Sequence, residues 1–300
     1  MRVAVFGATG FIGRRVVQAL AARGDVVVAY SRDPARAKSA LGERVECRAN
    51  DAVDGASLAD IDAVVNLAGE PIAEHRWNDA VKARLRSSRL DLTRAVVEAL
   101  ASAAPRPSVL VNASAVGYYG PCGDEEVTED APPGDDFLAT LCRDWEAEAR
   151  RAEAHGVRVV RARMGVVLGE AGGSLEKMLL PFKLFVGGPI GDGKQWFPWV
   201  HLDDAAGMIA HAVDHDALRG AANITAPSPV RFGAFADALG KALHRPAWLP
   251  VPSFALKAVA GEVAEVLLTG QRATPGAMSR SGYRFAFPSL DAALRDVLRS

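Results

Sequence analysis

The stretch that decides the fold is Gly7-Ala8-Thr9-Gly10-Phe11-Ile12-Gly13, which lies between the apolar run 3–6 and a helix-like stretch that reaches Arg23. A glycine turn in this position aims backbone N–H groups and the positive end of the helix at a phosphate. Gly7 permits the turn, Gly10 lets a pyrophosphate approach, and Gly13 lets the helix pack on the strand. The spacing is G-x-x-G-x-x-G, and the alternative is a purely structural turn. Because the motif opens a strand–loop–helix–strand unit, we interpret it as a dinucleotide site to which Thr9, Phe11 and Ile12 also contribute.

Apolar runs alternate with helix-like stretches along the first 165 residues. This alternation predicts parallel strands joined by right-handed crossovers, and hence an α/β fold with a Rossmann-type, doubly wound parallel sheet. Strands are predicted at 3–6, 26–30, 45–48, 61–67, 109–113 and 157–162, and helices at 11–23, 77–104 and 137–155.

Glycines and prolines become frequent after Arg163, which predicts a second part of the chain with a different character. We expect a dinucleotide-binding domain over residues 1–165 and a smaller, mostly helical C-terminal lobe over residues 166–300. Helices are predicted in the lobe near 232–243 and 254–268, and residues near 195–225 are expected to return to the first domain.

The composition of the 300 residues, 49% hydrophobic and 24% charged, is typical of a folded globular chain. A net charge of −1 favours no nucleic-acid partner. Three cysteines without a C-x-x-C pair favour neither a disulfide framework nor a zinc site, so reduced thiols and a cytoplasmic location are expected. No apolar run approaches the roughly 18 residues of a membrane span. The expected partner is a small-molecule substrate that the sequence does not identify, with no metal or membrane partner, and the chain is expected to be a monomer or homodimer.

The residues after the second apolar run bear on the choice of dinucleotide. A site specific for NAD usually has an acidic residue here, whereas this chain has Ser31 and Arg32. Arg32 can pair with a 2′-phosphate and Ser31 can donate a hydrogen bond, so NADP(H) is predicted over NAD(H), with NAD(H) as the open alternative. Asp33, one position later, complicates this prediction, and Arg32 as a plain surface arginine is the other possibility.

Three segments carry a resemblance to a known family: the glycine loop, Asn66-Leu67-Ala68-Gly69, and Trp199-Val200-His201-Leu202-Asp203-Asp204. They resemble the extended short-chain dehydrogenase/reductases. Within these, the chain is similar over essentially its whole length to the atypical "epimerase family protein" branch, which is NAD-dependent epimerase/dehydratase-like and ends in a domain of unknown function. In these families the His201 segment is mainly a helix start, so Asp203 is expected to cap a helix.

The resemblance also implies positions for cofactor contacts. Leu67, Ala68 and Gly69 would pass beside the adenosine half of the cofactor, and Arg89 would lie near the NADP phosphates, although a surface role for Arg89 is equally open. Val167 would lie near the nicotinamide, because residues 163–169 resemble the R-P-x-x-V-Y-G turn of extended members. Glu70 either lines the cleft or is a solvated loop acid.

The chain departs from the family in its proton relay. Short-chain dehydrogenases carry Tyr-x-x-x-Lys on a helix, where the ammonium lowers the pKa of the phenol. None of the four tyrosines has a lysine four positions later, and Leu138 and Cys142 occupy the equivalent positions.

Three hydroxyl side chains are the predicted replacements for the relay: Ser114, Tyr118 and Tyr119. Ser114 resembles the substrate-orienting Ser/Thr of the family, and either phenol could donate a proton, or the tyrosines could pack and bind substrate passively. Two functions follow: an NADP(H)-dependent oxidoreductase or nucleotide-sugar-epimerase-like enzyme, or a non-catalytic NADP(H)-binding regulator or scaffold.

Overall fold

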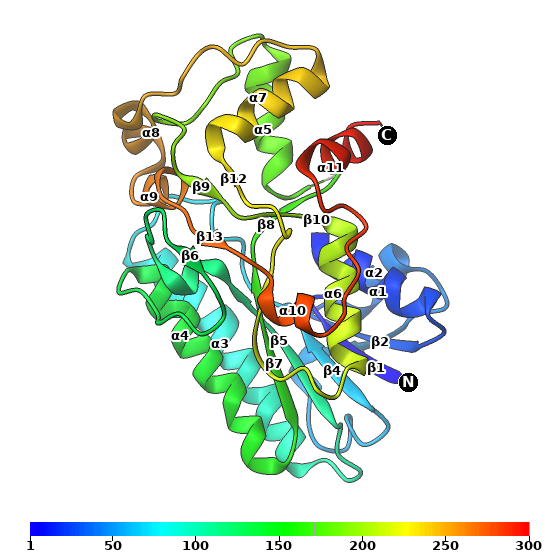
Figure 1. Ribbon diagram of the computed structural model, residues 1–300. Helices are drawn as coiled ribbons and strands as arrows, with labels where there is room; N and C mark the ends of the chain where they lie inside the picture. The colour runs from blue at the N-terminus through cyan, green and yellow to red at the C-terminus, as the bar shows by residue number, and fades with distance from the viewer. Residues whose placement is uncertain (171, 300) are drawn as a thin grey trace.

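The computed structural model describes residues 1–170 and 172–299, and a parallel seven-stranded sheet lies at its centre (Figure 1). Across the sheet the strands are β11 (Gly220–Ile224), β7 (Arg158–Met164), β5 (Val109–Ala115), β4 (Ala63–Asn66), β1 (Arg2–Phe6), β2 (Val26–Ser31) and β3 (Glu46–Ala49). Chain order reverses beside β1, as in doubly wound sheets that bind a ligand at this switch point. The predicted α/β fold with a Rossmann-type sheet is confirmed.

Different helices cover the two faces of the sheet. Val3 and Val5 of β1 pack on the side of α1 (Phe11–Ala22) and α6 (Leu202–Asp214), and Ala4 and Phe6 pack on the side of α3 (Asp79–Ser102). The remaining elements of this part are α2 (Pro34–Leu41), α4 (Phe137–Arg150) and the 3-10 turns η1 (Asn50–Ala52), η2 (Val116–Tyr119) and η3 (Arg151–His155). Successive strand residues point to opposite faces, so a continuous apolar run serves both layers.

The C-terminal lobe has its own core. Its helices are α5 (Gly173–Lys183), α7 (Phe232–Leu243), α8 (Ser253–Ala260), α9 (Val263–Leu268), α10 (Gly276–Arg280) and α11 (Leu290–Val297). Its short strands are β8 (Val166–Leu168), β9 (Trp196–Phe197), β10 (Trp199–His201), β12 (Val230–Arg231) and β13 (Arg272–Ala273). Trp199, with none of its surface exposed, lies in the core that joins α5, α7 and α11.

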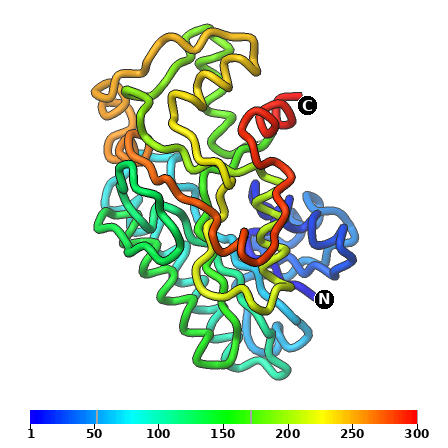
Figure 2. Tube along the Cα trace, in the orientation of Figure 1, coloured from blue at the N-terminus to red at the C-terminus, as the bar shows by residue number. Residues whose placement is uncertain are grey.

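The lobe is tied to the sheet domain at two places. β13 pairs in parallel with β6 (Glu126–Val127), and α6 and β11 carry residues 202–224 from the lobe back to the sheet. The end of the chain also passes the sheet domain. In Figure 2 the orange and red trace runs from the lobe past the sheet and then back to α11 in the lobe.

Two predicted helices differ from the structure. The stretch 254–268 is wrong as one helix, because Gly261 adopts a φ of +62° between α8 and α9. The stretch 137–155 is α-helical only to Arg150, after which it tightens into a 3-10 turn that Gly156 ends with a φ of +79°. Along the described chain, no helix is both long and apolar enough to cross a bilayer.

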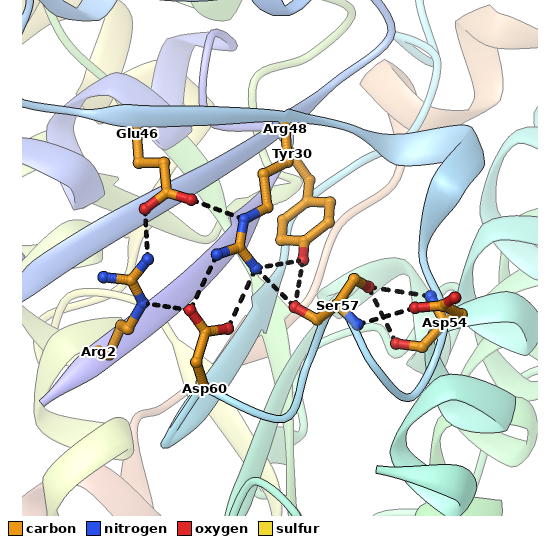
Figure 3. A network of polar contacts seen from close by, with 7 residues as sticks. All are labelled: Arg2, Tyr30, Glu46, Arg48, Asp54, Ser57 and Asp60. Carbon is orange, nitrogen blue, oxygen red and sulfur yellow. Dashed lines mark hydrogen bonds and ion pairs between the residues drawn. The ribbon is translucent and has the colours of Figure 1, made fainter.

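A polar network links β3, β2 and the loop that precedes β4, close to the strand that leads into the glycine loop (Figure 3). Arg48 of β3 donates to both carboxylate oxygens of Asp60, at 2.9 and 3.1 Å, and to the carbonyl oxygen of Ser57. The hydroxyl of Tyr30 donates to that same carbonyl at 2.8 Å, and its ring stacks on Phe6 at 4.5 Å. Because Phe6 and Tyr30 precede Gly7 and Ser31, the network holds the ends of β1 and β2 in register.

Candidate cofactor and substrate site

The glycine loop joins β1 to α1 and forms a cradle without side chains. Gly7 has a φ of +76°, and a Cβ there would lie 2.9 Å from backbone atoms of Leu67 and Ala68. A Cβ on Gly13 would overlap the carbonyl oxygen of Gly7, so only glycine lets α1 start this close to β1. Gly10 is exposed and is the N-cap of α1, with no side chain capping the helix. The first N–H groups of α1 therefore stay available to an anion.

The end of β2 presents Ser31 and Arg32 beside this cradle. The Ser31 hydroxyl accepts from the backbone N–H of Asp33 at 3.2 Å, and Arg32 is exposed. No hydrogen bond or ion pair of the Arg32 side chain is found within residues 1–170 and 172–299. The Asp33 carboxylate accepts from the N–H of Arg36 at 3.0 Å and so caps α2. Asp33 thus has a local structural role as the N-cap of α2.

Arg89 of α3 lies under the loop that follows β4. Its guanidinium donates to the carbonyl oxygens of Glu70 at 2.8 Å and Leu85 at 3.1 Å, and it sits 5.2 Å from the ring of Trp145. The residue is 8% exposed, and burial lowers its pKa. No carboxylate of the described residues pairs with Arg89 within 4 Å. A Cβ on Gly69 would lie 3.0 Å from this guanidinium, so the loop 67–70 rests directly on a buried positive charge.

The carboxylate of Glu70 pairs with a surface arginine. The carboxylate lies 3.6 Å from Arg84, with both side chains partly exposed, while the Glu70 N–H donates to the hydroxyl of Ser88. Leu67 and Ala68 are half-buried, and the N–H of Ala68 donates to the side chain of Asn66 at 3.3 Å.

A cleft of about 630 Å³ lies between the carboxyl ends of the strands and the lobe. It is large enough for a drug-sized ligand. Phe11, Ile12 and Val167, all predicted near the cofactor, line it together with Leu138. Thr9 lies on the other side of the glycine loop, where its carbonyl oxygen accepts from Arg14 at 2.9 Å. The structure therefore brings the glycine loop, the 67–70 loop and Val167 to one edge of the sheet.

The three hydroxyl residues predicted as catalytic lie beside the cleft, and none of them is among the described residues that line it. Ser114 is 2% exposed and donates to Glu146 at 2.7 Å. Tyr119 is 3% exposed; its hydroxyl donates to Asn223 at 2.6 Å and accepts from Arg163 at 2.9 Å. Burial raises the pKa of Tyr119 to about 12. Tyr118 is half-buried, and the Arg163 guanidinium lies 3.5 Å from its ring centroid. Their catalytic role stays a prediction.

The charged centre behind these residues was not foreseen from the sequence. Glu146 is 2% exposed and accepts from Arg163 at 2.8 and 2.9 Å and from Arg161 at 3.0 Å. Burial alone would lower the pKa of Arg163, but the hydrogen bonds and charge of Glu146 outweigh burial and leave that pKa raised. The available signal was the alternation in β7, where Arg161 and Arg163 lie on one face of a strand whose other residues, apart from Arg158 at its start, are apolar.

Two further features differ from or extend the predictions. The cap of α6 is His201, whose Nδ1 accepts from the N–H of Asp203, while the Asp203 carboxylate pairs with Arg15 at 2.5 Å; the prediction of Asp203 as cap is wrong. The lobe side of the cleft includes Trp196, whose aromatic ring is a candidate pocket wall from the sequence, and residues to which the sequence assigned no role: Gln195, Gln271 and three apolar residues of α9, Val263, Val266 and Leu267.

Comparison with known proteins agrees with this architecture. Residues 3–224 match the NAD dependent epimerase/dehydratase family, and residues 251–297 match a domain of unknown function, DUF1731. The chain is similar to the epimerase family protein SDR39U1 homolog, chloroplastic, of Arabidopsis thaliana, at 42% identity over 100% of this chain and 87% of that relative.

Two solved structures extend the comparison. The crystal structure of human epimerase family protein SDR39U1 (isoform 2) with NADPH superposes with a TM-score of 0.89, at 40% identity over 99% of each chain. The nucleoside-diphosphate sugar epimerase from Corynebacterium glutamicum superposes with a TM-score of 0.79, at 30% identity over 99% of this chain and 58% of that one. The resemblance predicted from the sequence motifs is confirmed.

Proposed function

The chain belongs to the NAD dependent epimerase/dehydratase family, and on that premise we propose that it binds NADP(H), in preference to NAD(H), across the carboxyl edge of its sheet. The observation that carries the proposal is the cradle formed by Gly7, Gly10 and Gly13, where added side-chain atoms would collide with or crowd the backbone. The uncapped start of α1 suits a pyrophosphate. The human relative, 40% identical, was crystallised with NADPH.

Two arginines support the choice of the phosphorylated cofactor. Arg32 extends from the end of β2 into solvent, where it can meet a 2′-phosphate in a charge-assisted hydrogen bond. Arg89 is a buried cation without a carboxylate partner in the described chain, and such a charge is costly unless an anion approaches it. Ser31, Leu67, Ala68 and Gly69 would shape the adenosine side.

We propose that the protein, with NADP(H) bound, is an oxidoreductase. When bound, the dinucleotide supplies or accepts a hydride at its nicotinamide ring. Phe11, Ile12 and Val167 provide an apolar wall that excludes water from that end of the site. Tyr118 is the proposed proton donor, because its neighbours Val116 and Gly117 line the cleft and a guanidinium supports its ring.

Ser114 and Tyr119 are proposed as positioning residues in this scheme. Ser114 holds the carboxylate of Glu146, and Tyr119 holds the guanidinium of Arg163 on which Tyr118 stacks.

A non-catalytic NADP(H)-binding regulator is the second candidate. It is favoured by α4, where Leu138 and Cys142 occupy the positions of the relay tyrosine and lysine. Burial raises the pKa of Cys142 to about 12, so its thiol is not a nucleophile at neutral pH.

The preference for NADP(H), which both candidates share, is tested by binding. The affinities for NADPH and NADH are measured by calorimetry in the wild type, in Arg32→Ala, and in Arg143→Ala as an exposed control on α4. We expect the wild type and the control to bind NADPH about tenfold or more tightly than NADH. Arg32→Ala should lose most of that preference, because it removes a charge-assisted hydrogen bond to the 2′-phosphate. Equal affinity for the two cofactors in the wild type would reject the NADP(H) preference.

Turnover separates the enzyme from the regulator. NADPH oxidation is followed with panels of ketones, aldehydes and sugar nucleotides. Activity that Tyr118→Phe abolishes while NADPH affinity is retained would support the oxidoreductase. NADPH binding without turnover, together with a partner that binds only one redox form, would support the regulator.

A further inference from the structure

The polar groups around the cleft give it an unusual charge pattern. No lysine or arginine is among the residues that line it in the described chain, whereas Asp136, Glu262 and Glu265 are. Each of these carboxylates already has a partner: Glu262 pairs with Lys82 at 2.5 Å, Glu265 pairs with Lys257 at 2.8 Å, and Asp136 caps α4. The nearest ammonium groups are therefore already engaged: those of Lys82 and Lys257 by these carboxylates, and that of Lys177 by the carbonyl oxygen of Ala73 at 3.2 Å.

The hydrogen-bond donors along the lining are also largely occupied. The amide nitrogen of Gln195 donates to the carbonyl oxygens of Ile190 and Leu267, at 3.1 and 3.0 Å. The amide nitrogen of Gln271 donates to Gly120 at 2.7 Å, the Thr269 hydroxyl donates to Glu265 at 2.7 Å, and the Trp77 indole donates to Ile72 at 2.9 Å. The amide and carboxylate oxygens that remain are acceptors, which repel a phosphate. The lining also contains Gly173 and Ser174 at the start of α5, where the N-cap residue Gly172 provides no side-chain hydrogen bond, so some donors remain at that end of the cleft.

The rest of the wall is apolar and aromatic. Trp77 and Phe137 meet edge to face at 5.0 Å on the sheet side, and Phe197 and Phe232 do so at 5.5 Å on the lobe side. Val266 of α9 faces the cleft between them with 39% of its surface exposed. Apolar surface left open in a concave site is typical of a ligand-binding surface.

We propose that this cleft binds an uncharged, apolar ligand with a flat aromatic or aliphatic body, and that it is not built for the diphosphate of a nucleotide sugar. The inference rests on the proposed function, since the cleft adjoins the proposed cofactor site. Burying a diphosphate against this lining would require Lys82 or Lys257 to leave its carboxylate partner, or would leave the phosphate charges beside those carboxylates. The name of the Corynebacterium relative, a nucleoside-diphosphate sugar epimerase, therefore does not carry over to this cleft.

Binding, rather than turnover, tests the proposal. The protein is saturated with oxidised NADP, so that a ketone cannot be reduced, and is titrated by calorimetry with methyl naphthyl ketone or with UDP-glucose. We expect the ketone to bind and UDP-glucose to bind at least about a hundredfold more weakly. Val266→Asp should weaken the ketone about tenfold or more, because it places a charge on the apolar wall. Val259→Asp is the matched control, since Val259 is a 75% exposed valine on the neighbouring α8 outside the lining.

The outcomes separate this inference from the proposed function. Tighter binding of UDP-glucose than of the ketone would overturn the inference. Arg76→Ala removes an exposed cation beside Gly261, and loss of UDP-glucose binding in this variant would strengthen that conclusion. Failure of the ketone to bind, or an equal effect of Val266→Asp and Val259→Asp, would overturn it as well. If the wild-type protein binds the ketone but does not bind NADP, only the proposed cofactor is rejected.

Discussion

Glu146→Gln should be among the most damaging conservative substitutions in the chain. The carboxylate accepts four hydrogen bonds: from Ser114 at 2.7 Å, from Arg163 at 2.8 and 2.9 Å, and from Arg161 at 3.0 Å. The side chains of Glu146 and Arg163 are 3% and 2% exposed, so water cannot replace what is lost. Glutamine keeps the shape but removes the charge, and its amide N–H groups would face arginine donors.

The magnitude follows from this burial. Removing one partner of a buried ion pair costs about 3–5 kcal/mol, because the remaining charge is left uncompensated. Exposed pairs contribute only about 0–1 kcal/mol. Glu153→Gln is the matched control, since Glu153 is 46% exposed in the side chain and lies 3.9 Å from Arg150. The two substitutions are chemically identical and should differ by about 3 kcal/mol in the free energy of unfolding.

Urea unfolding followed by tryptophan fluorescence measures the difference by linear extrapolation. A double-mutant cycle adds Arg163→Met, which removes the stranded cation. We expect the double variant to be about 1–3 kcal/mol more stable than the sum of the single effects, because the two groups are coupled. Equal costs for Glu146→Gln and Glu153→Gln, or strict additivity in the cycle, would refute the role given to this pair.

Three further predictions concern the loop, a thiol and a phenol. Gly13→Ala should abolish NADPH binding and lower the stability of the fold, because the added Cβ would overlap the carbonyl oxygen of Gly7. Calorimetry measures the binding and thermal unfolding measures the stability. Unchanged NADPH binding would contradict the close packing of Gly13 against Gly7. Cys142 should resist alkylation at neutral pH, since burial raises the pKa of its thiol to about 12, whereas the half-buried Cys47 should label faster; mass spectrometry ranks them. Burial also raises the pKa of Tyr119 to about 12, above the value of about 10 for an unfolded chain. The neutral phenol therefore stabilises the fold fully below about pH 10, and this contribution is lost as the pH rises towards 12, so Tyr119→Phe should unfold with a smaller pH dependence in that window.

The part of the site made from short stretches of chain was predictable from the sequence. The cradle at Gly7 to Gly13 and the residues at the end of β2 are local, because strand, turn and helix follow one another within a few residues. The lobe side of the cleft was not predictable, because α9 and α1 line the same cleft although they are separated by more than half of the chain. Gly261 divides α8 from α9 by adopting a positive φ, and an isolated glycine in an apolar stretch gives no such indication.

The buried charged residues were the second part of the site that the sequence did not predict. Glu146 lies on an amphipathic helix, where a glutamate is typical of a solvated face. Its burial depends on Arg161 and Arg163, which come from β7 and are separated from it by a turn and the remainder of α4. Composition and periodicity describe one element at a time, so an ion pair between two elements leaves little trace in either.

The face of α4 that bears Leu138, Cys142 and Glu146 connects the missing relay to the apolar cleft. These residues are four apart, so they lie on one side of the helix. Leu138 lines the cleft, Cys142 is buried behind it, and the carboxylate of Glu146 pairs with both Arg161 and Arg163 at the base. A lysine in place of Cys142 would add another cation to a buried region that already contains Arg89 and those two arginines, where the buried acidic residues of the described chain are Glu146 and Glu129. The charge arrangement therefore disfavours the relay lysine, and with it a relay tyrosine, whose pKa would have no ammonium to lower it. On the same helix face Leu138 lines the cleft, so the absence of the relay pair and the proposed preference for an apolar ligand are consistent with each other.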